Sequence, residues 1–312
     1  MISLDDIRAA ADRIAPHIRD TPTIEVTAVS EPVTDARLML KLECLQATGS
    51  FKARGATNKL LTLQKNELAN GIVTASGGNH GLAVARAARL AGVPATVFVT
   101  ESATQEKRDK LKRWGAKVEV LGQIWNETNE AALAFAEEKG AAYFHPFADP
   151  AVVAGQGTVG LELQEALPDL DVALVAIGGG GLISGMAVAL KALKPSIRII
   201  GIEPVGSPTL LASLQAGHVV RLEKVTSRVA TMSCGQTDQQ IFETVRDHVD
   251  DIVLVSDEAM IDAARWLWFE LGIAADLSGA AAIAALRSGA VSFGRDHTIG
   301  ALVCGAGPDG IG

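Results

Sequence analysis

Cysteine is scarce in this sequence, and its three cysteines, Cys44, Cys234 and Cys304, lie far apart. Their number is odd and no two form a CxxC pair, so the sequence indicates neither a disulfide framework nor a zinc site. An excess of basic residues is also lacking, because 28 lysines and arginines stand against 36 acidic residues. Nucleic acids and anionic membranes bind clustered basic side chains, so neither is expected as the main partner. A reducing cytoplasm is the location that fits best.

No segment is typical of a signal peptide or a membrane span. The first residues, MISLDDIRAAADRI, carry early acids and no apolar core. Residues 172–190 are uncharged over about the length that crosses a bilayer, but four consecutive glycines at 178–181 interrupt them. A buried strand, a glycine loop and a buried helix explain this run better.

Strand and helix signals alternate along the chain, which predicts an α/β fold of two doubly wound lobes. A helix is expected from Ser3 to about Pro16, and a second helix is expected to open at Ser50. A small lobe of residues 65–148 is expected to be inserted in a large lobe of residues 1–64 and 149–312. The expected strands are 36–43, 71–76, 94–100, 117–122, 172–178, 198–203, 252–256 and 298–304.

Glycine-rich segments lie where expected strands end, which is where ligands bind in such folds. Gly178 to Gly181 follow one strand and open a helix, so their N–H groups can approach a phosphate closely. A tight turn is the alternative, but it needs fewer glycines. Gly305, Gly307 and Gly310 match G-x-G-x-x-G, yet no helix or acidic residue follows, so a glycine-rich turn is the better interpretation.

Two further segments carry chemically useful side chains. Lys52 lies in the first turn of the helix expected after Ser50, and the helix N-terminus and adjacent Arg54 should favour its neutral amine. A neutral amine is what Schiff-base chemistry needs, although most lysines are merely solvated. Ser76 to His80 join a strand to a helix whose start can receive a carboxylate; an ordinary capped turn is the alternative.

Taken together, these segments resemble the serine/threonine dehydratase and serine racemase family of pyridoxal-phosphate enzymes, which have a tryptophan-synthase-β-like fold (fold type II). GSFKARGA resembles the cofactor-lysine segment and SGGNHG the serine–asparagine loop. AGQGT, GGGGL and VCGAG resemble three more family segments. The five occur in the family's order over nearly the whole chain.

The resemblance implies pyridoxal 5'-phosphate as the cofactor, Lys52 as the catalytic residue that holds it as a Schiff base, and a homodimer. Asn79 is expected to bind the phenolic oxygen of the cofactor, and Cys304 to face its pyridine nitrogen. The implied cofactor-binding residues are Lys52, Phe51, Asn79, Gly178, Gly179, Gly180, Gly181, Leu182 and Cys304. The implied substrate-binding residues are Ser76, Gly77, Asn79 and His80.

The implied reaction is β-elimination from a small L-hydroxy-amino acid such as L-threonine or L-serine, giving a 2-oxo acid and ammonia. Lys52 would remove the Cα proton as general base. An aspartate in place of Cys304 would keep the pyridine nitrogen protonated, whereas a thiol, with a reference pKa of about 8.5, is a poor proton source. Cys304 therefore favours elimination over transamination.

Several positions depart from the family pattern. Serine racemases carry serine at the position of Gly77, and glycine has no proton to give, so racemisation is not expected. Glu203 matches a family metal ligand, but Thr209 stands where aspartate is expected and Ser207 offers only its carbonyl. Because magnesium and calcium favour carboxylates, no metal is expected. Asp276 stands where the family usually has glutamate.

The sequence is also compatible with other functions. The substrate could be 3-hydroxyaspartate or phenylserine. Cysteine synthases, which perform β-replacement, have a threonine-rich loop in place of the segment that ends at His80, which argues against them. A non-catalytic ligand-binding protein on the same fold is a further alternative. His145, Trp125 and Phe147 either line the substrate pocket or belong to the core.

Overall fold

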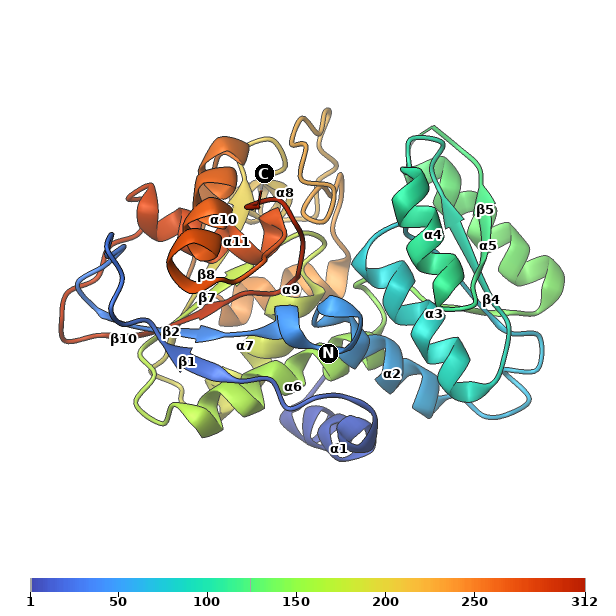
Figure 1. Cartoon of the computed structure of the whole chain (residues 1–312). Coiled ribbons are helices and arrows are strands. Elements are labelled where there is room, and N and C mark those ends of the chain that lie inside the picture. Colours follow the sequence, from blue (N-terminus) through green and yellow to red (C-terminus); the bar gives the residue numbers. More distant parts are fainter. Residues whose placement is uncertain (1, 124, 312) are drawn as a thin grey trace.

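Two sheets organise the chain, and Figure 1 shows them in two lobes. The structure is a computed structural model that describes residues 2–123 and 125–311. The larger sheet has the order β1-β2-β10-β7-β8-β9 and the smaller β5-β4-β3-β6. The named strands pair in parallel, apart from the antiparallel pair β1 and β2. The predicted doubly wound α/β fold is confirmed.

The larger sheet draws on both ends of the sequence. Its strands are β1 (Thr23–Glu25), β2 (Arg37–Lys41), β7 (Val172–Ala176), β8 (Arg198–Pro204), β9 (Asp251–Val255) and β10 (Thr298–Leu302). The helices around it are α1 (Leu4–Ile14), α6 (Pro150–Ala166), α7 (Gly181–Leu193), α8 (Thr209–Ala216), α9 (Gln239–His248), α10 (Asp257–Leu271) and α11 (Leu277–Arg287). Because β10 lies between β2 and β7, the last strand completes a sheet that the first strands begin.

The smaller sheet is built from one continuous stretch of chain. Its strands are β3 (Ile72–Ala75), β4 (Ala95–Val99), β5 (Lys117–Val120) and β6 (Ala142–Tyr143). Its helices are α3 (Asn79–Ala91), α4 (Gln105–Arg113) and α5 (Trp125–Lys139). Helix α2 (Lys52–Thr62) packs against both α6 and α3, so it joins the two lobes. The lobe limits 1–64, 65–148 and 149–312 remain a prediction.

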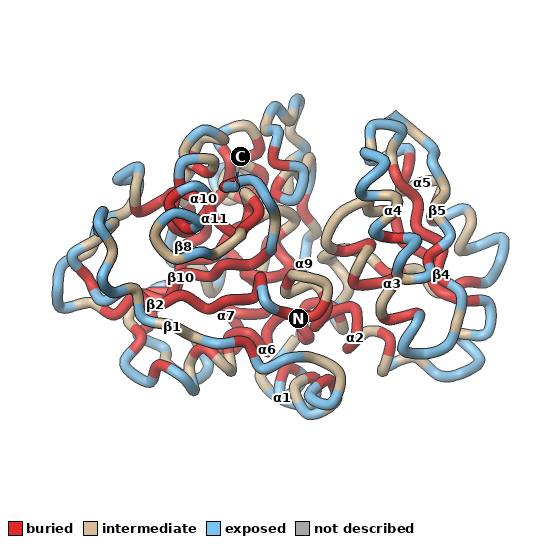
Figure 2. Tube along the Cα trace, viewed as in Figure 1, coloured by how far each residue is buried: buried red, intermediate tan, exposed pale blue. Residues whose placement is uncertain are grey.

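Burial explains why these segments form these elements. All five residues of β7 are buried, and the inner strands of both sheets are red in Figure 2. Strands covered on both faces are expected to read as continuous apolar runs. The uncharged stretch 172–190 is therefore β7, the glycine loop and most of α7, as predicted. Among the described residues, no helix is long and apolar enough to cross a membrane.

One helix start differs from the prediction. Ser50 was expected to open α2, but the helix begins at Lys52 and its N-cap, Phe51, makes no capping hydrogen bond. Ser50 instead pairs with Gly305 in an isolated antiparallel bridge, and its fully buried hydroxyl has no partner among the described residues. The N-terminal helix does begin after Ser3, which forms a capping box with Asp6.

Candidate active site

Lys52 lies at the junction of the lobes, at the first position of α2. Its Nζ donates a hydrogen bond to the carbonyl of Pro146, at 2.6 Å. Burial lowers the pKa of Lys52 to about 8, and the nearby thiols of Cys304 and Cys234 only partly oppose this shift. A buried amine that loses its proton near neutral pH can act as a nucleophile or a base.

Arg54 does not have the role that the sequence suggested. It was expected to favour the neutral amine of Lys52, but its guanidinium is fully buried and pairs with Glu43 at 2.7 Å and with Glu162 at 2.6 Å. Arg54 is not among the groups that shift the pKa of Lys52, whose leading cause is burial. The arginine is therefore part of the structural core beneath α2, and that part of the prediction is wrong.

The tetraglycine segment forms a close-packed cradle at the start of α7. A Cβ atom at Gly179 would lie 2.2 Å from the ring of Phe147, and one at Gly181 would lie 2.5 Å from the Phe147 carbonyl. Gly180, the N-cap of α7, has φ +93, a conformation that L side chains rarely adopt. Phe147 directly follows Pro146, the partner of Lys52, so the cradle and the lysine lie in one region.

A second helix N-terminus follows the loop Ser76–Gly78. Helix α3 begins at Asn79, and its N-cap, Gly78, makes no side-chain capping bond. The first N–H groups of a helix have no partner within the helix, so this start is suited to an anion. A Cβ atom at Gly77 would lie 3.5 Å from Val99, an ordinary contact distance.

His80 does not supply a positive charge to this loop. Its side chain is buried, and Nε2 lies 3.0 Å from the carbonyl of Phe144. Since a carbonyl only accepts, Nε2 carries the proton, and Nδ1 is a buried acceptor with no partner in the described residues. Burial, and then Lys52, lower the pKa of His80 to about 3. Any role in binding a carboxylate therefore falls to its backbone N–H.

A chain of side-chain hydrogen bonds runs from Cys304 to Asn79. The thiol of Cys304 donates to Ser278 Oγ at 3.7 Å, and Ser278 donates to Asp276 Oδ1 at 2.6 Å. Asn79 Nδ2 donates to Asp276 Oδ2 at 2.9 Å. Burial raises the pKa of Cys304, and Asp276 raises it further, so the thiol stays protonated. Sequence reasoning singled out Asn79 and Cys304 but missed Ser278.

The residues around Glu203 do not fit a divalent cation. Both carboxylate oxygens of Glu203 accept backbone hydrogen bonds, from the N–H groups of Leu210 and Leu211 at the start of α8. The hydroxyls of Ser207 and Thr209 both donate to the carbonyl of Cys234. Glu203 is thus the one carboxylate in this group, and its charge is already stabilised by the N-terminus of α8, whereas magnesium and calcium favour several carboxylate oxygens. In the described part of the chain, no cluster of three His, Cys, Asp or Glu could hold a metal ion.

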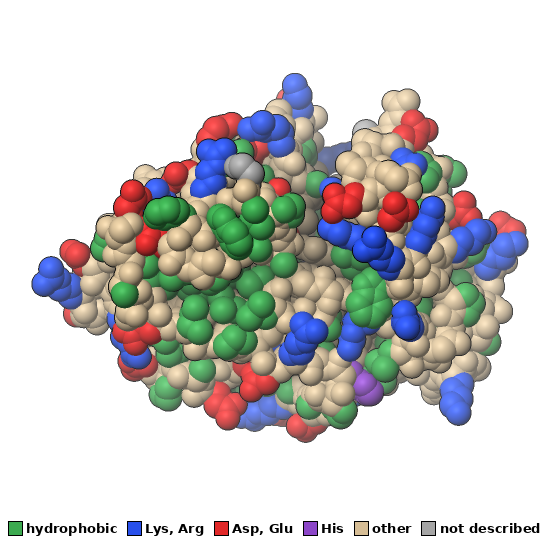
Figure 3. All heavy atoms as spheres, in the orientation of Figure 1, with side chains coloured by type: hydrophobic (Ala, Val, Ile, Leu, Met, Phe, Trp, Pro, Cys, Tyr) green, Lys and Arg blue, Asp and Glu red, His purple; other side chains and the backbone are tan. Residues whose placement is uncertain are grey.

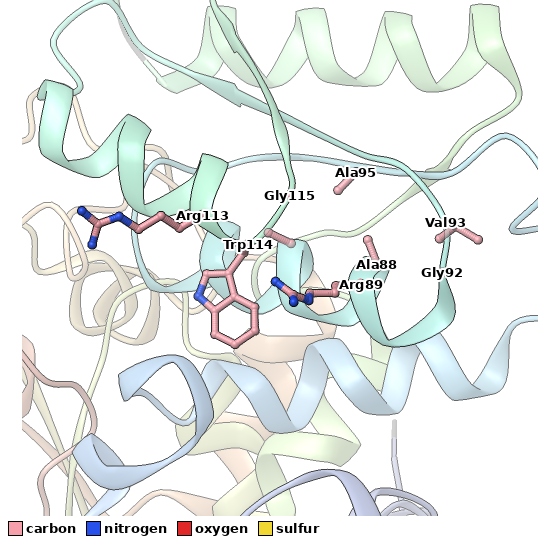
Figure 4. A pocket seen from close by; sticks show the side chains of 9 residues that line it. Ala88, Arg89, Gly92, Val93, Ala95, Arg113, Trp114 and Gly115 are labelled. Atoms are coloured by element: carbon pink, nitrogen blue, oxygen red, sulfur yellow. The ribbon is translucent and has the colours of Figure 1, made fainter.

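Two surface cavities lie away from the residues described above. One, of about 320 Å³, lies where α3 and α4 end, and Figure 4 shows Arg89, Arg113 and Trp114 around it. The Arg89 guanidinium lies beside Trp114, whereas that of Arg113 extends away from both, so the two do not converge on one ligand. The other, of about 410 Å³, is lined by Lys41 and Glu162 among others. Neither is lined by a residue predicted for the site, so the region around Lys52 remains the better candidate.

Comparison with known proteins identifies the family. The family model described as pyridoxal-phosphate dependent enzyme matches residues 14–305. This chain belongs to that family. It is 40% identical over 286 residues to the L-threonine ammonia-lyase of Thermotoga maritima, covering 92% of this chain and 71% of the relative. It is 38% identical to a serine racemase of Oryza sativa, covering 98% of this chain and 91% of the relative.

Solved structures of the same family have the same fold. The structure of maize serine racemase has a TM-score of 0.92 at 35% identity and covers 97% of this chain and 93% of that one. The structure of T.th. threonine deaminase has a TM-score of 0.90 at 36% identity, with 98% of both chains covered. These likenesses confirm the predicted family, the tryptophan-synthase-β-like fold and pyridoxal phosphate as the cofactor.

The residues present fit this cofactor. The cradle at Gly178–Gly181 leaves no room for side chains and ends on a helix N-terminus, which suits a phosphate group. Lys52 offers an amine with a lowered pKa for the aldehyde carbon. Cys304 and Asn79, at the two ends of one hydrogen-bond chain, offer polar atoms for the ring.

Proposed function

We propose that this chain is an ammonia-lyase that removes the β-hydroxyl group and the amino group of L-threonine or L-serine, giving a 2-oxo acid and ammonia. The observation that carries the proposal is the half-buried amine of Lys52, which contacts Pro146 next to the glycine cradle and has its pKa lowered to about 8. The relatives named L-threonine ammonia-lyase and catabolic L-threonine dehydratase support it, at 40% and 38% identity.

Lys52 is proposed as the residue that holds the cofactor and, when free, removes the Cα proton. A base with a pKa near the working pH combines a useful unprotonated fraction with enough strength to accept the proton. The carbonyl of Pro146, 2.6 Å from Nζ, orients the amine and accepts one of its hydrogens. Bound pyridoxal phosphate would supply a ring that stabilises negative charge at Cα.

The two helix N-termini are proposed to bind the two anions of the reaction. The start of α7 at Gly178–Gly181 and Leu182 takes the cofactor phosphate, with Phe51 lining the cofactor site. The loop of Ser76 and Gly77 and the start of α3 at Asn79 and His80 take the substrate carboxylate. Because His80 is neutral, uncharged donors and the helix field hold that carboxylate.

Cys304 is proposed to face the pyridine nitrogen without protonating it. Ser278 has one hydroxyl hydrogen and gives it to Asp276, so the thiol of Cys304 must be the donor in its contact with Ser278. The proton of Cys304 is thereby directed to Ser278 and not to the ring. This hydrogen-bond direction strengthens the argument for elimination over transamination.

Serine racemisation is the second candidate, because serine racemases of Oryza sativa and maize are among the relatives. It needs an acid on the face of Cα opposite Lys52. Gly77, which stands where the resemblance places that acid, has no side chain, so elimination is favoured. The assay below ranks L-threonine, L-serine, 3-hydroxyaspartate and phenylserine as substrates.

We also propose that the protein is a cytoplasmic homodimer. Phe269 and Trp268 on α10 are 82% and 42% exposed. Large apolar side chains exposed together on one face are typical of a protein–protein interface. Figure 3 shows hydrophobic side chains gathered on the face of the larger lobe over α10, α11, β10 and β2. The three cysteines are unpaired, which suits a reducing compartment.

The test is 2-oxo acid release from the purified protein with each of the four substrates, beside a Lys52→Ala control. Product from one or more substrates, with a visible cofactor band that the control lacks, is the expected result. The same bound cofactor with no product from any substrate would overturn the proposed elimination. Chiral analysis of the recovered serine tests racemisation in the same samples.

A further inference from the structure

Asp276 is a buried carboxylate at the centre of the site. It is the N-cap of α11 and is 9% exposed. Its Oδ1 accepts from Ser278 Oγ and from the Gly279 N–H, at 2.6 and 2.7 Å, and its Oδ2 accepts from Asn79 Nδ2 at 2.9 Å. Within residues 2–123 and 125–311, no lysine or arginine forms an ion pair with it. Its hydrogen-bond partners are therefore neutral donors, and each has a defined direction.

The contact with Asn79 crosses between the lobes. Asn79 begins α3, which packs on the smaller sheet, whereas Asp276 precedes α11 of the larger one. The two side chains are 197 residues apart in sequence. Asn79 presents its nitrogen to Asp276 Oδ2, so the amide oxygen is turned away from Asp276. Burial raises the pKa of Asp276, and the hydrogen bonds from Ser278, Gly279 and Asn79 oppose that rise by favouring the carboxylate. The amide then has one N–H left to give to a ligand.

The backbone of Gly305 and Gly307 packs closely against this pair of side chains. A Cβ atom at Gly305 would lie 2.4 Å from Asp276 Oδ2 and 2.9 Å from Asn79 Nδ2. A Cβ atom at Gly307 would lie 2.8 Å from the Cβ of Asp276. The G-x-G after the last strand thus has a structural role, because it lets the backbone pack against the carboxylate. The same packing leaves the Asp276 side chain little space to move.

We propose that Asp276 is a positioning residue that fixes the orientation of the Asn79 amide, so that its remaining N–H faces the phenolic oxygen of the cofactor. The inference rests on the proposed function for the place of Asn79 beside the ring. A hydrogen bond to an oxygen stabilises the charged form of that oxygen and lowers its pKa. Asp276 therefore sets the protonation of the cofactor without touching it.

The substitution Asp276→Asn tests this directly. The side-chain oxygen of an asparagine at position 276 can still accept hydrogen bonds from Ser278 and Gly279. Its nitrogen then faces Asn79 and donates, so the Asn79 amide has to rotate and present its oxygen in place of its nitrogen. The readout is the pH midpoint of the visible absorbance change of the bound cofactor, measured without substrate. We expect the midpoint to rise by about one pH unit, the shift that one lost hydrogen bond produces.

Asn79→Ala and the double variant complete the cycle. Asn79→Ala should raise the midpoint in the same direction, and adding Asp276→Asn should change it no further, because both remove one interaction. Asp309→Asn is the matched control: Asp309 is exposed and accepts from the Leu277 N–H at 3.2 Å, so it alters the same helix start without touching Asn79. Because the charge of Asp309 raises the pKa of Asp276, this variant favours the carboxylate and leaves the Asn79 contact in place, so its midpoint should move far less than that of Asp276→Asn.

Four outcomes overturn one idea or the other. An unchanged midpoint in Asp276→Asn, or shifts of the two single variants that add in the double variant, would sink the positioning role. A lower melting temperature with an unchanged midpoint would give Asp276 a purely structural role. If the unaltered protein has no cofactor band that depends on Lys52, the proposed function fails instead, and the two failures are thus distinguished.

Discussion

At the scale of single residues, Lys52 owes its reactivity to burial more than to its neighbours. The neutral form of an amine dominates above its pKa, which burial lowers to about 8. An exposed lysine reaches that state only near its ordinary value of 10.5. The desolvation of the half-buried Lys52 amine, and not the adjacent Arg54, thus controls its chemistry.

A pH series on the cofactor-free protein tests this explanation. The rate at which added pyridoxal phosphate produces its visible band should rise with pH up to about 8 and then level off, because only the neutral amine reacts. Stopped-flow absorbance measures the rate, with Lys52→Ala as the blank for exposed lysines. A rate that keeps rising toward pH 10.5 would mean that the amine is solvated.

Gly77 is the residue at which elimination and racemisation should diverge. A serine Cβ there would meet Val99 and Ala103 at ordinary distances of 3.5 and 3.7 Å, so Gly77→Ser should fold with an unchanged melting temperature. Its hydroxyl supplies the acid that glycine lacks, and we expect D-serine to appear from L-serine. Chiral chromatography measures both enantiomers. A stable variant that forms 2-oxo acid but no D-serine would contradict this role.

The sequence could predict some of these residues and not others. Asn79 and Cys304 each lie in a short segment that resembles a known family, so each could be named from its own segment alone. The link between them could not, because Asp276 and Asn79 are far apart in sequence and no local pattern reports a contact between lobes. The ion pairs of Arg54 were not predictable either, because adjacency along a helix does not say which way a side chain points.

At the scale of elements, ion pairs that are largely buried anchor α2 to the larger lobe. Arg54, two residues after Lys52, pairs with Glu43 of the segment after β2 and with Glu162 of α6. Lys41 of β2 also pairs with Glu162, at 2.6 Å. These contacts fix the helix that carries the cofactor lysine to the larger lobe.

Replacing Arg54 should therefore lower the stability of the protein substantially. Arg54→Met leaves the fully buried Glu43 without a cation, and we expect the free energy of unfolding to fall by about 3–5 kcal/mol. Urea unfolding of the cofactor-free protein measures it. Arg8→Met, which breaks a solvent-exposed pair with Asp5, should change stability by less than about 1 kcal/mol. Equal losses in the two variants would refute the special role of the buried network.

Elements were predictable in proportion to the length and regularity of their patterns. The apolar runs of β7 and β10 and the amphipathic α1 were foreseen close to their observed limits. The strands β1 and β6 have three and two residues, too few to show a period. Helix α8 is only eight residues long, which leaves little of a helical period to read. Helix α9 did carry a signal that went unused: Asp238 caps it, and Ile241, Phe242 and Val245 form its buried face.

At the scale of the whole molecule, the exposed apolar surface of the larger lobe predicts self-association. Phe269→Lys should convert a dimer into a monomer, because it places a charge where an apolar contact is expected. Leu90→Lys, on α3 of the smaller lobe and 42% exposed, is the matched control and should remain a dimer. Light scattering after size exclusion measures the mass. An unaltered protein that is already monomeric would remove the basis of the proposal.

The order of strands in the larger sheet also has a consequence for biosynthesis. The smaller sheet uses residues 72–143 alone and can form while the ribosome is still adding later residues. The hairpin of β1 and β2 has to wait, because its neighbour in the sheet, β10, is made last. The lobe that is begun first is therefore completed last, and a nascent chain interrupted before residue 298 leaves an apolar strand edge for chaperones to cover.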